Sequence, residues 1–182
     1  MNVLLVFGST HGHTWRIARR IARDLRHAGN TVTVRRIDAA PDDLSPFDAV
    51  VVGGSLHRGT HQRELVDWAH AHHRALAARP NAFFSVSLSA ADDSIEAQIA
   101  VRECIDRFVE DTEWDPDVSA PLAGALQYPR YSFPTRLSMH LFMHQTDHPD
   151  DITREFEFTD WDAVDHFART VVHHLERSLL PA

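Results

Sequence analysis

The clearest chemical signal in the chain is a short loop near its start, with the sequence GSTHGHT over residues 8–14. Three hydroxyl side chains and two glycines stand within these seven residues. An apolar run typical of a β-strand precedes the loop, and an amphipathic stretch typical of a helix follows it. A phosphate monoester placed there would meet hydroxyl donors and the backbone N–H groups at the positive end of a helix. We therefore predict a phosphate site formed by Ser9, Thr10, His11, Gly12, His13 and Thr14.

Other phosphate-binding motifs do not fit this loop. The chain has eighteen arginines and no lysine, which excludes a Walker-type loop, a Schiff-base mechanism and a catalytic lysine. The dinucleotide fingerprint G-x-G-x-x-G is also absent from the loop. The structural alternative is that Thr14 only caps a helix and Gly12 only permits a turn. Three hydroxyls at the carboxyl end of the first strand favour the ligand site over this alternative.

Two further loops are predicted at the same edge of the sheet. The sequence GGSLHRG over residues 53–59 follows the third predicted strand, and SVSLSA over residues 85–90 follows the fourth. A hydrolase nucleophile elbow, G-x-S-x-G, is excluded because His57 stands where its last glycine is required. Loops at the carboxyl ends of parallel strands converge on one site. The candidate ligand residues in these loops are Gly54, Ser55, Leu56, His57, Arg58, Gly59, Ser87, Leu88 and Ser89.

The elements that must position these loops alternate short apolar runs with longer amphipathic segments. This alternation indicates βα units around a parallel sheet with helices on both faces. The length of 182 residues predicts one domain over residues 1–182. The predicted strands cover residues 3–7, 32–37, 49–52, 82–86 and 118–126, and the predicted helices cover residues 14–27, 64–78, 95–110 and 161–180.

The first loop resembles the FMN-phosphate loop of flavodoxins, and Ser9, Thr10, Gly12 and Thr14 carry the resemblance. It implies FMN as a non-covalent cofactor that carries the redox chemistry. It also implies an α/β, flavodoxin-like fold, with a doubly wound five-stranded parallel sheet in the order 2-1-3-4-5.

The same resemblance implies that the loops at residues 53–59 and 85–90 lie on the two sides of the isoalloxazine ring. The glycines of the first of these loops would let the backbone approach the flavin closely. Leu56 and His57 would pack against the ring, and Arg58 would face its N1–O2 edge or the phosphate.

Residues 127–153 interrupt the βα rhythm and are predicted to form an insertion at the fifth strand. The segment carries three prolines, both tyrosines of the chain and a helix candidate over residues 135–144. Its length and aromatic content favour a functional segment over a disordered one. The alternating sequence EFEFT over residues 155–159 predicts an edge strand that completes the fifth position of the sheet.

Around this insertion the chain resembles the flavodoxin-type, menaquinone-dependent protoporphyrinogen IX dehydrogenases. The sequence AGALQYPRY over residues 123–131 resembles their A-G-A-L-x-Y-P-R-Y motif, and residues 159–161 are similar to their T-D-W segment. Residues 82–86 and 113–117 also look like family positions, so the resemblance covers essentially the whole chain. It implies oxidation of protoporphyrinogen IX to protoporphyrin IX by successive two-electron transfers to FMN, with a quinone as electron acceptor.

The resemblance implies substrate contacts for Tyr128, Arg130 and Tyr131, since aromatic rings can stack on a macrocycle and arginine can pair with propionates. Their alternative role is to anchor the insertion on the sheet edge. No acid–base residue is predicted, because the flavin carries the chemistry. Three alternative functions stay open: a flavodoxin-type electron-transfer protein, an NAD(P)H:quinone reductase that uses FMN, and a flavin-free binding module. The insertion favours the porphyrinogen enzyme, because an electron carrier has no evident use for it.

Composition restricts the partners and location of the chain. The formal net charge of −8 should repel nucleic acid. The single cysteine, Cys104, excludes an intramolecular disulfide, fits a reducing cytoplasm and is expected to be buried and inert. Neither a leader nor a membrane-spanning run is evident, which predicts a cytoplasmic protein. The histidines at residues 70–73 and 140–144 lack the accompanying ligands of a metal site, so no metal is predicted. The sequence does not indicate the oligomeric state.

One departure from the family concerns the membrane. The helix of the family's insertion is rich in lysine, whereas Arg136, His140 and His144 stand here, followed by three aspartates between residues 147 and 151. We expect only weak attraction to an anionic membrane at neutral pH. A weak peripheral contact with the inner face of the cell membrane, and the quinone as acceptor, therefore stay open.

Overall fold

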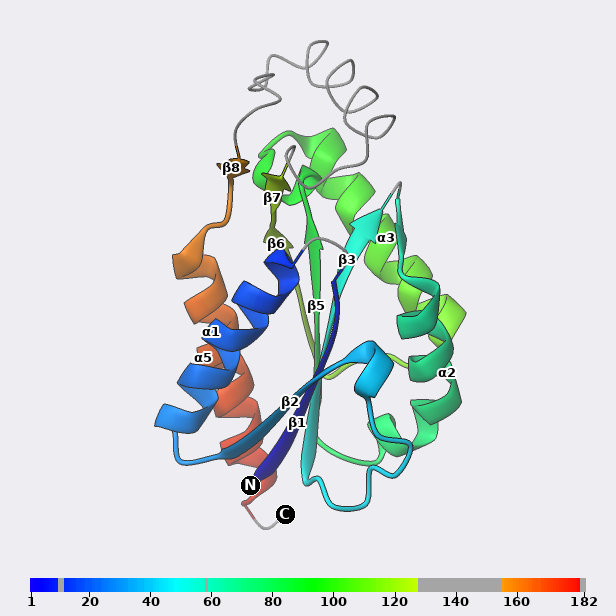
Figure 1. Ribbon diagram of the computed structural model, residues 1–182, viewed down its shortest axis with the longest axis vertical. Coiled ribbons are helices and arrows are strands. Elements are labelled where there is room, and N and C mark those ends of the chain that lie inside the picture. Colours follow the sequence, from blue (N-terminus) through cyan, green and yellow to red (C-terminus); the bar gives the residue numbers. More distant parts are fainter. Residues whose placement is uncertain (10–11, 58, 128–154, 181–182) are drawn as a thin grey trace.

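The structure is a computed structural model that describes residues 1–9, 12–57, 59–127 and 155–180 (Figure 1). Within these residues, the central sheet has five parallel strands in the order β2-β1-β3-β5-β6. Helices α1 and α5 cover one face, and α2 and α3 cover the other (Figure 1). The parallel strands are β1 (Asn2–Gly8), β2 (Thr31–Arg36), β3 (Ala49–His57), β5 (Asn81–Ser87) and β6 (Val118–Ala123), and the helices are α1 (His13–His27), α2 (Arg63–Ala77), α3 (Ile95–Thr112) and α5 (Trp161–Ser178).

Shorter elements complete the fold. A two-residue strand, β4 (Thr60–His61), pairs antiparallel with the end of β3. Two 3-10 turns, η1 (Ile37–Ala39) and η2 (Ser89–Ala91), follow β2 and β5. Strands β7 (Ala125–Gln127) and β8 (Glu155–Glu157) form a separate antiparallel pair, which we call the β7–β8 ribbon. The doubly wound arrangement and the strand order 2-1-3-4-5 are confirmed for the five parallel strands.

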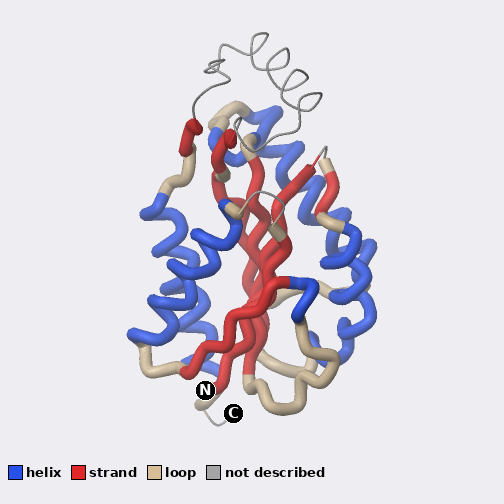
Figure 2. The backbone as a smooth tube through the Cα atoms, viewed as in Figure 1, coloured by secondary structure: helices blue, strands red, loops and turns tan. Residues whose placement is uncertain are grey.

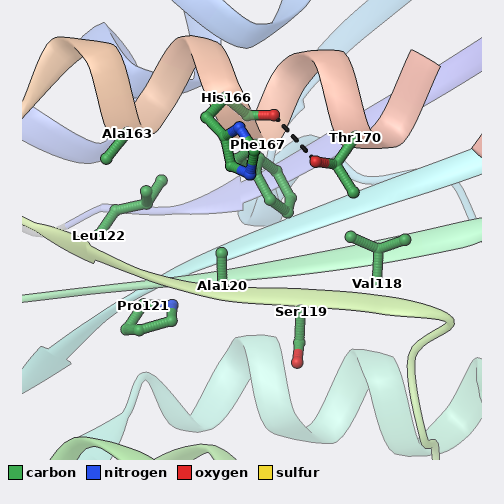
Figure 3. Close-up of a pocket in the computed structure, with 9 residues that line it drawn as sticks. All are labelled: Val118, Ser119, Ala120, Pro121, Leu122, Ala163, His166, Phe167 and Thr170. Atoms are coloured by element: carbon green, nitrogen blue, oxygen red, sulfur yellow. Dashed lines mark hydrogen bonds between the residues drawn. The ribbon is translucent and has the colours of Figure 1, made fainter. Parts of the chain in front are cut away.

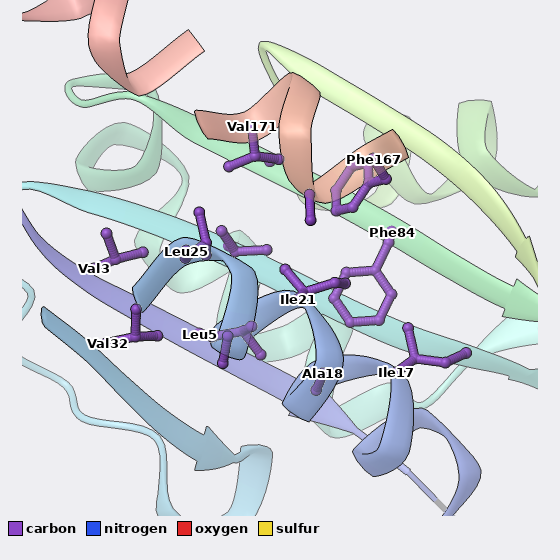
Figure 4. Close-up of a cluster of buried hydrophobic side chains, with 14 of the residues drawn as sticks. Val3, Leu5, Ile17, Ala18, Ile21, Leu25, Val32, Phe84, Phe167 and Val171 are labelled. Carbon is purple, nitrogen blue, oxygen red and sulfur yellow. The ribbon is translucent and has the colours of Figure 1, made fainter. Parts of the chain in front are cut away.

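The core on the α1 and α5 face follows from the spacing of apolar residues in α1. Ile17, Ile21 and Leu25 recur every four residues and are fully buried, because this spacing places them on one side of the helix. They pack with Leu5 of β1 and Phe84 of β5 in one cluster (Figure 4). The arginines of α1 occupy its other side, as the sequence predicts.

The core on the α2 and α3 face is built from aromatic rings. Phe83 of β5 and Phe108 of α3 stack with centroids 4.1 Å apart. Trp114 is buried beside both rings, and its indole N–H donates to Oδ1 of Asn81 over 3.2 Å. This bond satisfies the polar edge of a buried tryptophan. Together, the two cores hold the sheet between its helix layers.

The end of the sheet differs from the prediction in one respect. The predicted strand over residues 118–126 is divided at Gly124, where β6 ends and β7 begins. Residues 155–157 form a strand, but β6 holds the fifth position and β8 pairs with β7 outside the main sheet. The prediction that residues 155–159 complete the fifth position was therefore wrong. The physical reason is that β5 ends at Ser87, whose carbonyl accepts from the Gly124 N–H over 2.9 Å, and the next residue, Ala125, pairs with Glu157 instead.

Cys104 also differs from the prediction, because its side chain is only half-buried. Its thiol donates to the carbonyl oxygen of Gly59, with Sγ and O 3.4 Å apart. Within the described parts of the chain, no helix has the length and apolar character needed to cross a membrane.

Close packing of β3 against β5 generates a stability prediction. A Cβ atom added at Gly53 would lie 2.0 Å from Cζ of the buried Phe84 ring. We expect Gly53→Ala to lower the free energy of unfolding by about 1–3 kcal/mol because of this overlap. Urea denaturation of Gly53→Ala, Phe84→Leu and the double variant would measure it. The Phe84→Leu change should cost less in the Gly53→Ala background, and strictly additive costs would contradict the packing explanation.

Candidate functional site

The three predicted loops lie at one edge of the sheet. Strands β1, β3 and β5 are neighbours and run parallel, so their carboxyl ends face the same way (Figure 1). The strands of the central sheet lie side by side between the two helix layers (Figure 2). Gly8 is in register with Gly54, and Gly54 is in register with Ser85. The segments that follow these strands are therefore side by side, as a ligand that touches all three would require.

The first loop presents the amino end of α1 with a glycine at the N-cap position. Gly12 is the N-cap residue, with φ 91° and ψ −5°, and as a glycine it offers no side-chain oxygen to this end. The first turn also carries no acidic residue. This arrangement suits a phosphate, because the helix dipole is most positive here and the first backbone N–H groups have no carbonyl partner within the helix. The left-handed φ of Gly12 explains why glycine stands there.

Two hydroxyl residues of the first loop are placed by this turn. The Gly12 N–H donates to Oγ of Ser9 over 2.9 Å, so the Ser9 hydroxyl keeps its own proton to donate to an anion. Thr14 is the second residue of α1 and is buried. It is therefore not the N-cap that the structural alternative required. Thr10 and His11 lie outside the described residues.

The side chain of His13 is bonded to a residue just before the last helix, α5. The buried imidazole places Nε2 2.6 Å from Oγ1 of Thr159, which lies between β8 and α5. The Thr159 hydroxyl donates its single proton to the carbonyl of Gly124, with the oxygens 3.4 Å apart. The Thr159 hydroxyl therefore connects the His13 imidazole to the Gly124 carbonyl.

The second loop is a hairpin that extends β3. The strand runs to His57, beyond the predicted end at residue 52, and pairs antiparallel with β4. Gly59 turns the chain with φ 80°, where a left-handed conformation is needed. Leu56 is half-buried and His57 is exposed at the tip, while Arg58 lies outside the described residues.

The paired glycines of β3 are required by packing within the chain. A Cβ atom at Gly54 would lie 2.6 Å from Cδ2 of Leu65 and 2.9 Å from Cδ2 of His61. Gly53 is restricted in the same way by Phe84. Sequence reasoning did not predict this packing role, and the close approach of the flavin to these glycines stays a prediction.

A buried histidine supports this hairpin, and no sequence pattern predicts it. His61 is 8% exposed, and its Nε2 lies 2.9 Å from Oγ of Ser85. Its ring contacts the edges of Phe83 and Phe108, with centroids 5.4 and 5.0 Å away. Burial lowers the pKa of His61 to about 4, so the imidazole is neutral at neutral pH. Nothing in the spacing of this histidine distinguishes it from the exposed ones.

Gln62 is a second residue that sequence reasoning missed. Its Nε2 donates to Oγ of Ser55 over 2.6 Å. A Cβ atom added at Gly8 would lie 2.6 Å from Oε1 of Gln62. Gln62 therefore fills the space between the ends of β1 and β3, and it orients the Ser55 hydroxyl.

The third loop is a tight turn after β5. The N–H of Ala90 donates to Oγ of Ser87 over 3.2 Å, which starts the η2 turn. Leu88 is half-buried, and Ser89 is exposed. The structure thus places these residues beside the hairpin at the same edge. Tyr128, Arg130 and Tyr131 lie outside the described residues, as does the predicted helix over residues 135–144, and both assignments stay predictions.

A separate groove lies along β6, away from these loops (Figure 3). Its volume is about 280 Å³, and Leu122 and Phe167 contribute apolar side chains to its lining. None of the predicted ligand residues lines it, so we do not assign the cofactor to it.

Comparison with known proteins identifies the family. A protein-family model described as "Flavodoxin domain" matches residues 4–153 of this chain. A protein named protoporphyrinogen IX dehydrogenase [quinone] from Escherichia coli K12 is 30% identical over 183 aligned positions, which cover 99% of each chain. One of the same name from Leishmania major is 32% identical over 170 positions, covering 91% of this chain and 72% of that one. The chain belongs to the flavodoxin-type protoporphyrinogen IX dehydrogenase family.

This family membership confirms the resemblance carried by residues 123–131 and 159–161. It also confirms FMN as the cofactor, because the matched domain is a flavodoxin domain. The residues present fit that cofactor at the first loop, where a helix end with glycine at its N-cap and the Ser9 hydroxyl can receive a phosphate.

Solved structures confirm the fold of this family member. Flavodoxin 1 from Bacillus cereus aligns over 100% of both chains, with a TM-score of 0.57 and 13% identity. Rubredoxin oxygen:oxidoreductase from Desulfovibrio gigas aligns with a TM-score of 0.61 and 14% identity. That alignment covers 99% of this chain but only 37% of the larger protein. At these identities the likeness shows the fold alone.

The buried His61 makes stability depend on pH. Its pKa is about 4 in the folded chain and about 6.5 when unfolded. Above pH 6.5 both states are neutral at this residue, whereas between pH 6.5 and 4 only the unfolded state takes up the proton. This residue should therefore remove about 3 kcal/mol of stability as the pH falls from 7 to 4.

Urea denaturation of His61→Gln between pH 7 and 4 tests this linkage. The variant should lose less stability on acidification than the natural chain does, and His70→Gln, at an exposed histidine of α2, is the matched control. Equal acid sensitivity in His61→Gln and the natural chain would contradict the assignment.

Proposed function

We propose that this chain oxidises protoporphyrinogen IX to protoporphyrin IX, with FMN as its redox cofactor and a quinone as electron acceptor. The observation that carries the proposal is the similarity to the Escherichia coli enzyme of that name, which extends over 99% of both chains. That similarity includes the insertion, which an electron carrier does not need. Flavodoxin-type electron transfer and NAD(P)H:quinone reduction stay the alternatives, and neither has a specific observation in its favour.

The first loop would hold the FMN phosphate. Ser9 would donate its hydroxyl proton, and the backbone N–H groups that begin α1 would supply further donors. Thr14 would add a second hydroxyl from within the first turn. No lysine is required, because the helix end itself supplies positive potential and Gly12 brings no side chain of its own to it.

The other two loops would hold the isoalloxazine ring between them. On one side stands the β3–β4 hairpin with Leu56 and His57 near its tip. On the other side stands the turn that begins at Ser87. Bound FMN supplies the acceptance and onward transfer of electrons, so the loops need only bind, orient and shield the ring. The proposed ring contacts are Gly54, Ser55, Leu56, His57, Arg58, Gly59, Ser87, Leu88 and Ser89.

The substrate would contact Tyr128, Arg130 and Tyr131. These residues directly follow β7 in the sequence. Aromatic rings offer a surface for the macrocycle, and a guanidinium offers paired donors for its propionates. The quinone would be reached through a weak peripheral contact with the membrane, since the net charge of −8 opposes firm binding to an anionic surface.

The phosphate assignment predicts a selective loss of FMN affinity in Thr14→Val. Valine keeps the shape of the buried side chain but removes the hydroxyl, so FMN should bind about tenfold more weakly. Riboflavin, which lacks the phosphate, should bind equally well to both proteins. Titration of the apoprotein by flavin fluorescence measures both affinities. Thr170→Val is the matched control, because its hydroxyl donates within α5 to His166 O. Equal weakening of both flavins would contradict the assignment.

The proposed activity is tested by an anaerobic assay with protoporphyrinogen IX and a soluble quinone analogue, read by porphyrin fluorescence. The FMN-loaded protein should form porphyrin far faster than an enzyme-free control does. Tyr128→Ala should lower kcat/KM by about two- to tenfold without loss of FMN, and Tyr128→Phe should restore it. No porphyrin formation by the FMN-loaded protein would instead support electron transfer or another substrate.

A further inference from the structure

The two chain segments that flank residues 128–154 meet at one junction. The β7–β8 ribbon pairs Ala125 with Glu157, and the N–H of Phe158 then donates to the carbonyl of Gly124 over 3.1 Å. The hydroxyl of Thr159 donates to the same carbonyl over 3.4 Å. Gly124 and Thr159 therefore close the base of the ribbon.

This junction is bonded to two of the three loops at the candidate site. The N–H of Gly124 donates over 2.9 Å to the carbonyl of Ser87, in the third loop. Nε2 of the His13 imidazole is hydrogen-bonded to the Thr159 hydroxyl over 2.6 Å. Because His13 directly follows Gly12, this second bond joins the first turn of α1 to the ribbon.

Other contacts between α1 and the ribbon are on the surface. Arg16 and Glu157 form an ion pair of 2.9 Å, but their side chains are 52% and 35% exposed. Solvent and salt screen such a pair, so it stabilises little. The imidazole of His13 is 6% exposed, and its bond is therefore shielded from competing water. The His13–Thr159 bond is the stronger mechanical link.

We propose that His13 is a positioning residue that couples the FMN-phosphate loop to the β7–β8 ribbon through Thr159. A phosphate that orders the first turn of α1 would also fix the imidazole and, through it, the base of the ribbon. Coupling between two sites is reciprocal, so the ribbon would in turn strengthen FMN binding. The proposed substrate residues directly follow the ribbon strand β7 in the sequence, so the His13–Thr159 bond would also affect substrate affinity. The location of the phosphate in this proposal rests on the proposed function.

Hydrogen exchange of the full chain, with and without FMN, tests the coupling directly. In the natural chain, FMN should slow exchange of the amides at residues 124–127 and 155–159 by about three- to tenfold. His13→Ala and Thr159→Val should lose this protection while still binding FMN, with a Kd about three- to tenfold higher. His13→Gln and Thr159→Ser, which keep the donor and the acceptor, should restore the protection. Thr170→Val should behave as the natural chain does.

Steady-state kinetics provide a second readout. His13→Ala and Thr159→Val should raise KM for protoporphyrinogen IX by about three- to tenfold and change kcat by less than about twofold. Full FMN-dependent protection of the ribbon in both variants would overturn the proposal, as would its absence in the natural chain. If the natural chain turned over no porphyrinogen, the proposed function would fail, and the exchange result would still decide the coupling by itself.

Discussion

The binding of a phosphate dianion without any lysine is the constraint on which the rest of the site depends. The amino end of a helix offers about half an elementary charge and a set of backbone donors. Gly12, the N-cap residue, brings no side chain of its own to this end and adopts a left-handed conformation. A helix end can position a phosphate only if the helix itself is rigidly placed. The fully buried face of α1 packs against the sheet and fixes the helix there.

The strand order places the other two loops next to the first one. Because β1, β3 and β5 are neighbours, the first loop, the hairpin and the third turn meet at one edge. The hairpin is supported by His61, a neutral buried imidazole that bonds Ser85 and packs in a T-shaped arrangement against the stacked rings of Phe83 and Phe108. Gln62 fills the gap between the ends of β1 and β3. Rigid packing beneath a polar rim is what a cofactor site of this class needs.

Periodicity predicted the helices and the parallel strands, because apolar spacing reports directly which side of an element is buried. The order of the strands followed from the resemblance to flavodoxins. Periodicity did not predict the extension of β3 to His57, since glycine and polar residues replace the apolar run there. Nor did it predict the division at Gly124, which depends on where the neighbouring strand β5 ends. The burial of His61 and the packing role of Gly53 are likewise set by distant residues. Local pattern therefore located the loops, and tertiary contacts determined how each is supported.

Backbone amide chemical shifts measured during titration with FMN test most directly whether the helix end holds the phosphate. The amide protons of Gly12, His13 and Thr14 should move strongly downfield with FMN, because hydrogen bonds to a charged phosphate deshield them. Riboflavin should leave these three amides nearly unmoved while it shifts those of the hairpin and the third turn. If riboflavin shifted the amides of Gly12, His13 and Thr14 as strongly as FMN does, or if these amides did not respond to FMN, the phosphate would be bound elsewhere.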